Sequence, residues 1–196
     1  MKKENLWDRI VDESKSQGEW GKFSKFVSKH WDLLLTEDYE HLNETVLNRI
    51  LDLLASPQFQ AAQAKDETWV LLNKVESEWE RLSGDHKQKL LSTLEAGWPH
   101  FQDWMWPFSI SEFMEKFADG EGLATVQRLK AVVAVEQNRW AIPHAFEHIV
   151  RGATDSRIAQ QAYEELMTMI EEPDEQVRYE ANLSLRRLKT RGLVPE

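Results

Sequence analysis

The chain has 196 residues, of which 41% are hydrophobic, and it contains 9 Trp and 8 Phe residues. This length fits one domain or two small ones, and the apolar side chains supply enough bulk for a continuous core, which excludes a globally disordered chain. With 24 Lys and Arg residues against 34 Asp and Glu residues, the formal net charge is −10, which disfavours binding to nucleic acids and to anionic lipids.

The sequence predicts no membrane span, because no window holds the roughly 18 consecutive apolar residues that a span requires. Four charged residues lie within positions 1–8, where a signal peptide would need an apolar stretch. The chain has no cysteine, which excludes disulfides, thiolate nucleophiles and cysteine zinc sites and agrees with a reducing compartment. We therefore expect a cytoplasmic protein.

Apolar residues recur three and four positions apart through much of residues 1–97, which is the period of helices with one buried face. The predicted stripes are Trp20, Phe23, Val27, Trp31 and Leu34; Leu47, Ile50, Leu51 and Leu54; Leu72, Val75, Trp79 and Leu82; and Leu90, Leu91 and Leu94. Ser56 and Pro57 mark one joint between helices, and Ser83 and Gly84 mark another. Short joints favour antiparallel neighbours, so residues 1–97 are predicted to form an N-terminal helical half.

Residues 98–110 lack this regularity, because two prolines interrupt a segment that carries five aromatic residues. We predict that this segment joins the N-terminal half to a C-terminal helical half at residues 111–196. Its Trp104 and Trp106 offer large apolar area at little entropic cost, as interface hot spots do, and are candidate partner-binding residues. The alternative is that these aromatics anchor the connection in the core.

Capping and helix-breaking residues are predicted to divide the C-terminal half. Ser111 can cap a helix over residues 112–118, and Gly120 can end that helix. Pro143 can open a later helix, because its missing N–H is not needed in the first turn. Gly152 can close that helix in the position where a positive φ is required.

Two segments near the end of the chain share one spacing of Asp, a β-branched residue, Ala and Leu. The residues are Asp155, Ile158, Ala162 and Leu166, and then Asp174, Val177, Ala181 and Leu185. The spacing combines an acidic N-cap, a small residue for close helix approach, and larger residues that fill the gap. The second segment begins at Pro173 and adds a Val-Arg pair at 177–178, and this pattern resembles the second helix of a HEAT repeat.

The helical period predicts an all-α chain of about 9–10 helices. The HEAT resemblance, which is confined mainly to residues 155–188, implies stacked antiparallel helical hairpins in an α-solenoid. An irregular helical bundle is the alternative, since residues 1–110 show no persuasive repeat. HEAT-like arrays commonly serve as scaffolds or binding surfaces, so the resemblance implies no catalytic residue.

His144, Glu147 and His148 follow the H-x-x-E-H order of inverted zinc peptidases. On a helix the two histidines lie one turn apart, and the glutamate beside them could act as a general base. A catalytic zinc needs a third protein ligand, which families with this order supply well downstream, where Glu164 and Glu165 are available. Because nothing singles out either residue, the favoured interpretation is two histidines that flank an aromatic residue on a partly exposed helix face.

Four carboxylates, Glu171, Glu172, Asp174 and Glu175, crowd a predicted helix-to-helix turn. They could simply keep the protein in solution, or they could recognise a basic partner, since complementary charge accelerates association. These four residues are therefore candidate partner-binding residues beside the two tryptophans.

The leading hypothesis is a non-enzymatic protein-binding module with an acidic surface and a basic protein partner. Immunity or antitoxin-type inhibitors of basic, nuclease-like toxins are a specific case of matching charge and size. This hypothesis involves no catalytic residue, cofactor or metal. The alternatives are a metal-dependent helical hydrolase that uses His144, Glu147 and His148, and a HEAT-like nucleic-acid enzyme, which the net charge disfavours.

Overall fold

The fold is known from a computed structural model, which describes residues 48, 51, 54, 72–73, 75–100 and 105–194. Of residues 100, 105 and 106, only the backbone is described. Every regular element in these ranges is an α-helix or a 3-10 helix, which confirms the all-α prediction for this part of the chain. None of the described helices combines the length and the apolar character needed to cross a bilayer.

The chain divides into two compact units, Met1–Thr93 and Leu94–Glu196, and the division falls within a helix that precedes the predicted joint. The described elements in chain order are η1 (Trp79–Arg81), α6 (Gly84–Gly97), η2 (Trp98–His100), α7 (Met105–Phe113), α8 (Gly120–Val132), η3 (Val135–Gln137), α9 (Ala141–Gly152), α10 (Ser156–Thr168), η4 (Met169–Glu171) and α11 (Glu175–Thr190).

In the first unit, the described apolar residues of the predicted stripes are mostly buried. The buried ones are Leu51, Leu54, Leu72, Val75, Leu82, Leu90 and Leu91. The predicted joint at Ser83 and Gly84 is confirmed, because α6 begins there and the Ser83 hydroxyl accepts a hydrogen bond from the His86 N–H at 3.2 Å. The stripe predicted from Trp20 to Leu34 lies outside the described residues.

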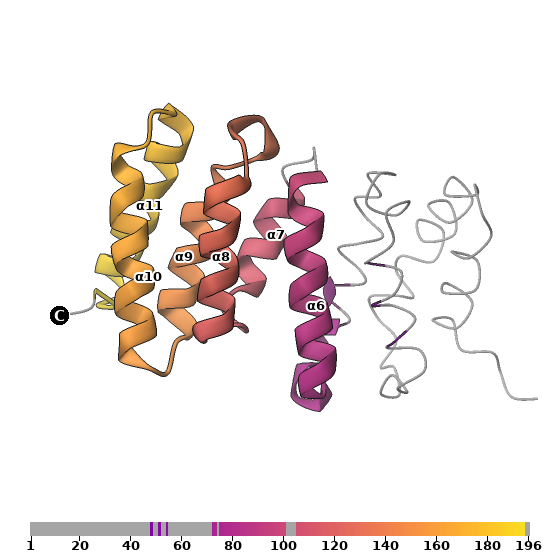
Figure 1. The fold of residues 1–196 in the computed structure, drawn as a ribbon. Helices are drawn as coiled ribbons and strands as arrows, with labels where there is room; N and C mark the ends of the chain where they lie inside the picture. Colours follow the sequence, from indigo (N-terminus) through magenta and orange to yellow (C-terminus); the bar gives the residue numbers. More distant parts are fainter. Residues whose placement is uncertain are drawn as a thin grey trace, which may run out of the picture. The chain divides into compact units, whose positions relative to one another are not determined.

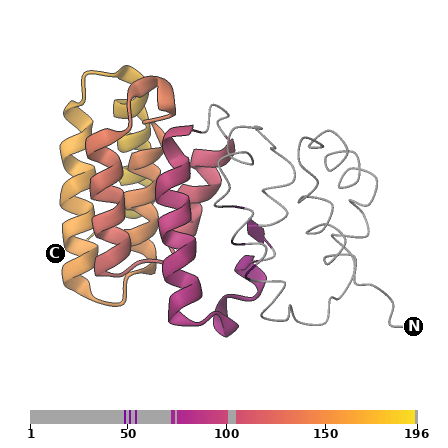
Figure 2. The same cartoon turned by 45° about the vertical axis from the view of Figure 1, so that its right-hand side comes forward.

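Helix α9 is the centre of the second unit, since it packs against α7, α8, α10 and α11. Figure 1 shows α8 and α10 side by side with α9 and α11 behind them, and the turned view in Figure 2 agrees. All ten residues from 141 to 150 are buried. A helix that is covered on every side must find partners for its polar side chains inside the protein.

The two HEAT-like segments form α10 and α11, and both predicted N-caps are confirmed. Asp155 and Asp174 each accept a hydrogen bond at 2.9 Å from a backbone N–H in the first turn of their helix. The small residues Ala162 and Ala181 are fully buried, as close helix packing requires. Leu185 differs, because it is only half-buried and lines a groove beside α11.

The helix predicted over residues 112–118 was placed too late in the chain. Helix α7 begins at Met105 and ends at Phe113, so it includes part of the predicted joint. Pro107 lies in its first turn, where a missing N–H costs nothing, and therefore does not interrupt the helix. Ser111 is not an N-cap, because its hydroxyl donates a 2.6 Å hydrogen bond to a carbonyl of the preceding turn.

The role predicted for Gly120 was wrong, and the one predicted for Gly152 was right for the helix end and wrong for the backbone conformation. Gly120 is the first residue of α8 rather than a stop, because Asp119 precedes it and accepts hydrogen bonds from N–H groups of the first turn. Gly152 ends α9 without a positive φ, which among the described glycines only Gly192 adopts. Gly152 is needed for space, since a Cβ there would lie 2.2 Å from the carbonyl oxygen of Glu115.

This close approach predicts that Gly152→Ala lowers the free energy of unfolding by about 1–3 kcal/mol, because the turn at Glu115 would have to move away from α9. Gly84→Ala is the matched control, since nothing lies within 4 Å of the added methyl group, and its effect should stay below about 0.5 kcal/mol. Urea denaturation measures both, and equal stabilities of the two variants would contradict the close approach.

Candidate functional site

Ionisable side chains gather where α9 meets α7 and α11. This α9 polar cluster consists of Glu112, Glu115, His144, Glu147, His148, Arg151 and Arg187. Its members come from α7 and the turn after it, from one face of α9, and from α11. The cluster forms because α7 and α11 both pack against this face of α9.

The two histidines of the cluster are buried, with His144 only 7% and His148 only 4% exposed. The prediction of a partly exposed face was therefore wrong. Their Nε2 atoms face each other at 3.2 Å, and their rings meet edge to face with centroids 4.5 Å apart. Phe108 stacks on the His144 ring at 4.9 Å between centroids, which leaves that ring little freedom to turn.

The other nitrogen of each ring faces a carboxylate. The Nδ1 atom of His144 lies 3.4 Å from Glu147, and the Nδ1 atom of His148 lies 2.9 Å from Glu115. An ionised carboxylate can only accept a hydrogen bond, so an Nδ1 atom that bonds to its carboxylate is the donor. When both rings are neutral, this arrangement leaves both Nε2 atoms as acceptors.

Two arginines complete these contacts from the outer side. Arg151 pairs with Glu115 at 3.0 Å, and Arg187 of α11 pairs with Glu147 at 3.2 Å. Each histidine is therefore held by a carboxylate that is itself held by an arginine. Such a chain of contacts fixes the orientation of the imidazole rings.

Glu147 remains an anion in this environment although it is only 1% exposed. Burial raises the pKa of Glu147, but hydrogen bonds from His144 and Arg187 outweigh this effect and lower the pKa to about 2. A carboxylate with so low a pKa, already paired with a guanidinium, is a weak proton acceptor. The geometry thus disfavours Glu147 as the general base of a hydrolase.

His148 is neutral at pH 7. Burial is the main reason that its pKa falls to about 4, and the nearby His144 and Arg151 lower it further, whereas Glu115 opposes them. A neutral imidazole keeps a lone pair on one nitrogen, as a metal ligand must.

Three members of the cluster could hold a metal ion. Glu112, His144 and His148 each offer a ligand atom, and these atoms all lie within 4.8 Å of one another. The third ligand thus comes from α7, upstream of the histidines, rather than from α10 downstream. The downstream candidates have other partners, since Glu164 accepts a hydrogen bond within α10 and Glu165 binds a lysine of α8.

The four carboxylates predicted to form an acidic cluster at residues 171–175 differ in their contacts, because two of them have partners within the protein. Glu172 pairs with Arg139 at 2.7 Å, with both side chains 16% exposed, and Asp174 caps α11. Glu171 and Glu175 remain exposed. Of the predicted tryptophans, Trp104 lies outside the described residues, and the backbone of Trp106 belongs to α7.

Exposed apolar residues lie where α8 is followed by η3, at the same end of the second unit as the connection that carries these two carboxylates. Val132 is 67% exposed and Val135 is 49% exposed. Together with Glu136, Glu171 and Glu175 they define what we name the acidic end surface. None of its three carboxylates forms an ion pair with another described residue.

Two ion pairs hold this end of the unit together. Lys130 of α8 pairs with Glu165 of α10 at 2.7 Å, and Arg139 before α9 pairs with Glu172 after η4. Figure 1 shows the α8–α9 and α10–α11 connections at the same end of the second unit. The valines and the exposed carboxylates are therefore presented from neighbouring connections.

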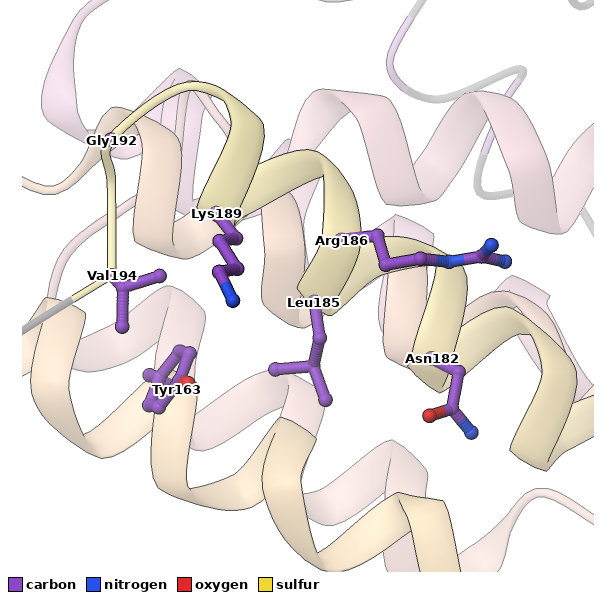
Figure 3. Close-up of a pocket in the computed structure, with 7 residues that line it drawn as sticks. All are labelled: Tyr163, Asn182, Leu185, Arg186, Lys189, Gly192 and Val194. Atoms are coloured by element: carbon purple, nitrogen blue, oxygen red, sulfur yellow. The ribbon is translucent and has the colours of Figure 1, made fainter.

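A second surface feature is a groove between α10, α11 and the residues after α11, with a volume of about 550 Å³. It is lined by Tyr163, Asn182, Leu185, Arg186, Lys189, Gly192 and Val194. Figure 3 shows Leu185 between Tyr163 and the polar Asn182. The sequence did not reveal that its two cations, Arg186 and Lys189, share a groove.

No protein-family model, curated protein or solved structure matches this chain. The HEAT-like resemblance therefore stays a prediction. The function has to be argued from the chemistry of the α9 polar cluster, the acidic end surface and the groove.

The pairing of Glu147 predicts that Glu147→Gln lowers the free energy of unfolding by about 3 kcal/mol at pH 7, because Arg187 loses its buried counter-charge. Glu164→Gln replaces an exposed carboxylate on α10 and should change stability by less than about 0.5 kcal/mol. Urea denaturation of the two variants and the wild type measures the difference.

The same pair predicts a pH dependence. Because the folded pKa of Glu147 is about 2 and the ordinary value is 4.5, the carboxylate stabilises the fold fully above about pH 4.5. The stabilisation is lost as the pH falls from 4.5 toward 2, so the difference between wild type and Glu147→Gln should shrink in that range. A difference that stays constant between about pH 7 and pH 3.5 would contradict the low pKa of Glu147.

Proposed function

We propose that this chain is a cytoplasmic, non-enzymatic protein-binding module that holds a basic partner on the acidic end surface. The observation that carries the proposal is a pair of exposed valines at the same end of the second unit as carboxylates that form no ion pair with other described residues. Interfaces combine an apolar centre with a polar rim, and charge complementarity speeds association and excludes wrong partners. The net charge of −10 favours a basic partner in the same way.

The proposed architecture is a HEAT-like stack in which α8–α9 and α10–α11 are successive hairpins. The capped starts of α10 and α11 and their buried alanines support this interpretation. In a stack of hairpins, loops of successive repeats gather at one end and form a continuous surface. An acidic inhibitor of a basic, nuclease-like toxin is the specific case that size and charge favour.

The enzymatic alternatives have weaker support. A hydrolase would need Glu147 as its base, and that carboxylate is buried against Arg187. A nucleic-acid enzyme would need many cations along a phosphate backbone, and Arg186 and Lys189 supply only a local positive charge on an acidic chain.

A photo-reactive amino acid in place of Val135 tests the proposed surface inside the cell. We expect one dominant cross-linked protein, with a basic isoelectric point, identified by mass spectrometry. The matched control carries the same probe at Gln161, an exposed position on α10 outside the acidic end surface. The same adducts from both positions, or no adduct from Val135, would contradict the proposal.

For the partner captured in this way, Glu171→Lys should weaken binding about 10-fold or more, because a like charge replaces a complementary one. Glu121→Lys makes the same charge change in the first turn of α8, at the opposite end of that helix from Val132, and should have little effect. Titration calorimetry at two salt concentrations measures both. Equal effects of the two variants would show that only net charge matters.

A further inference from the structure

The two Nε2 atoms of the α9 polar cluster present an electrostatic problem. Glu147 and Glu115 hold the Nδ1 protons of His144 and His148, so two neutral rings would direct two lone pairs at each other across 3.2 Å. Two acceptors at this distance repel unless a positive species lies between them. The buried pair therefore calls for either a proton or a metal ion between the two Nε2 atoms.

The geometry matches a metal ion. Zinc–nitrogen bonds of about 2.0–2.1 Å at a tetrahedral angle place two ligating nitrogens about 3.3–3.4 Å apart. The observed separation of 3.2 Å is close to this value. The two rings stand edge to face, so they do not stack on each other at this position.

A third ligand is available beside the histidines. A carboxylate oxygen of Glu112 and one ring nitrogen of each histidine all lie within 4.8 Å of one another. Glu112 belongs to α7, which packs against α9, and its side chain is exposed where those of the histidines are buried. Two imidazoles and one carboxylate are a set that zinc and other first-row divalent ions accept.

The charges and supporting contacts fit a cation as well. With neutral imidazoles, the three glutamates of the cluster face two arginines, so the cluster carries a net negative charge. In known metal sites, a ligating histidine donates its second ring N–H to a carboxylate, which fixes its orientation. Glu115 and Glu147 are the accepting carboxylates here, and each is held in turn by an arginine.

We propose that Glu112, His144 and His148 bind one divalent transition-metal ion of the zinc class, which links α7 to α9. Glu115 and Glu147 are positioning residues that act through the histidines. The site is structural, because two of its ligands are buried and Glu147 is paired with Arg187. It does not depend on the proposed partner surface, since none of its residues belongs to the acidic end surface.

Titration of the chelator-treated full chain with Zn²⁺, against a chromophoric competitor, tests the site. We expect one equivalent to bind tightly, and Co²⁺ bound in its place should show visible absorption of nitrogen and oxygen coordination. A free Zn²⁺ concentration about 100 times the dissociation constant should raise Tm by about 5–10 °C. If a shared proton occupies the position instead, neither stoichiometric binding nor a shift of Tm will occur, and the proposal is overturned.

Variants locate the ligands. Glu112→Gln removes an exposed carboxylate without disturbing the core, and it should weaken Zn²⁺ binding about 100-fold or more. His148→Gln should do the same, and circular dichroism reports whether it folds. Glu115→Gln should weaken binding about 10–100-fold, as loss of a supporting carboxylate does in known metal sites.

The matched control is Glu164→Gln, which removes a carboxylate that the sequence offers as a third ligand but that lies on α10. It should bind Zn²⁺ as the wild type does. If Glu112→Gln also binds like the wild type, or if Glu164→Gln loses affinity, the ligand set is wrong. Since Glu112→Gln leaves the buried residues unchanged, this outcome decides the question even if His148→Gln fails to fold.

Discussion

The burial of α9 on every side is the constraint on which the second unit depends. Residues 141–150 of this helix have almost no contact with solvent, so its ionisable side chains must be satisfied by neighbouring elements. The turn after α7 supplies Glu115, and α11 supplies Arg187. The close approach that Gly152 permits brings that turn against α9, so backbone packing and side-chain chemistry depend on each other.

Because α9 is buried, the second unit has two sites of different character, the α9 polar cluster and the acidic end surface. The histidines and Glu147 of the α9 polar cluster are buried and held in fixed contacts, which suits an ion and gives a protein partner little access to them. The acidic end surface lies where helices connect, and its carboxylates and valines are exposed. Binding of a partner and binding of a metal can therefore be tested separately, because changes at Glu171 and at Glu112 affect different parts of the unit.

The sequence predicts what is decided by neighbours along the chain. The N-caps at Asp155 and Asp174 and the buried small residues of α10 and α11 follow from spacing alone. The roles of Pro107 and Gly120 were harder to predict from the sequence, because proline and glycine can end one helix or begin the next. Only the flanking contacts decide between these roles. The N-terminal stripe and Trp104 lie outside the described residues, so their predictions stay open.

For a similar reason, the sequence predicted the two histidines of the candidate site but not its third ligand, Glu112. The spacing of His144 and His148 shows that they share a helix face, but the spacing does not tell which helix covers that face. Glu112 lies far upstream, and it meets the histidines because α7 packs against α9. The partly exposed face that the sequence suggested became a buried one once α7 and α11 covered it.

Hydrogen exchange along the chain tests this account most directly. If α9 is the covered centre of the unit, the backbone amides of residues 145–150 should exchange more slowly than those of α8, α10 and α11, and only through global unfolding. Exchange from α9 that is as fast as exchange from α10 would contradict the central role of this helix.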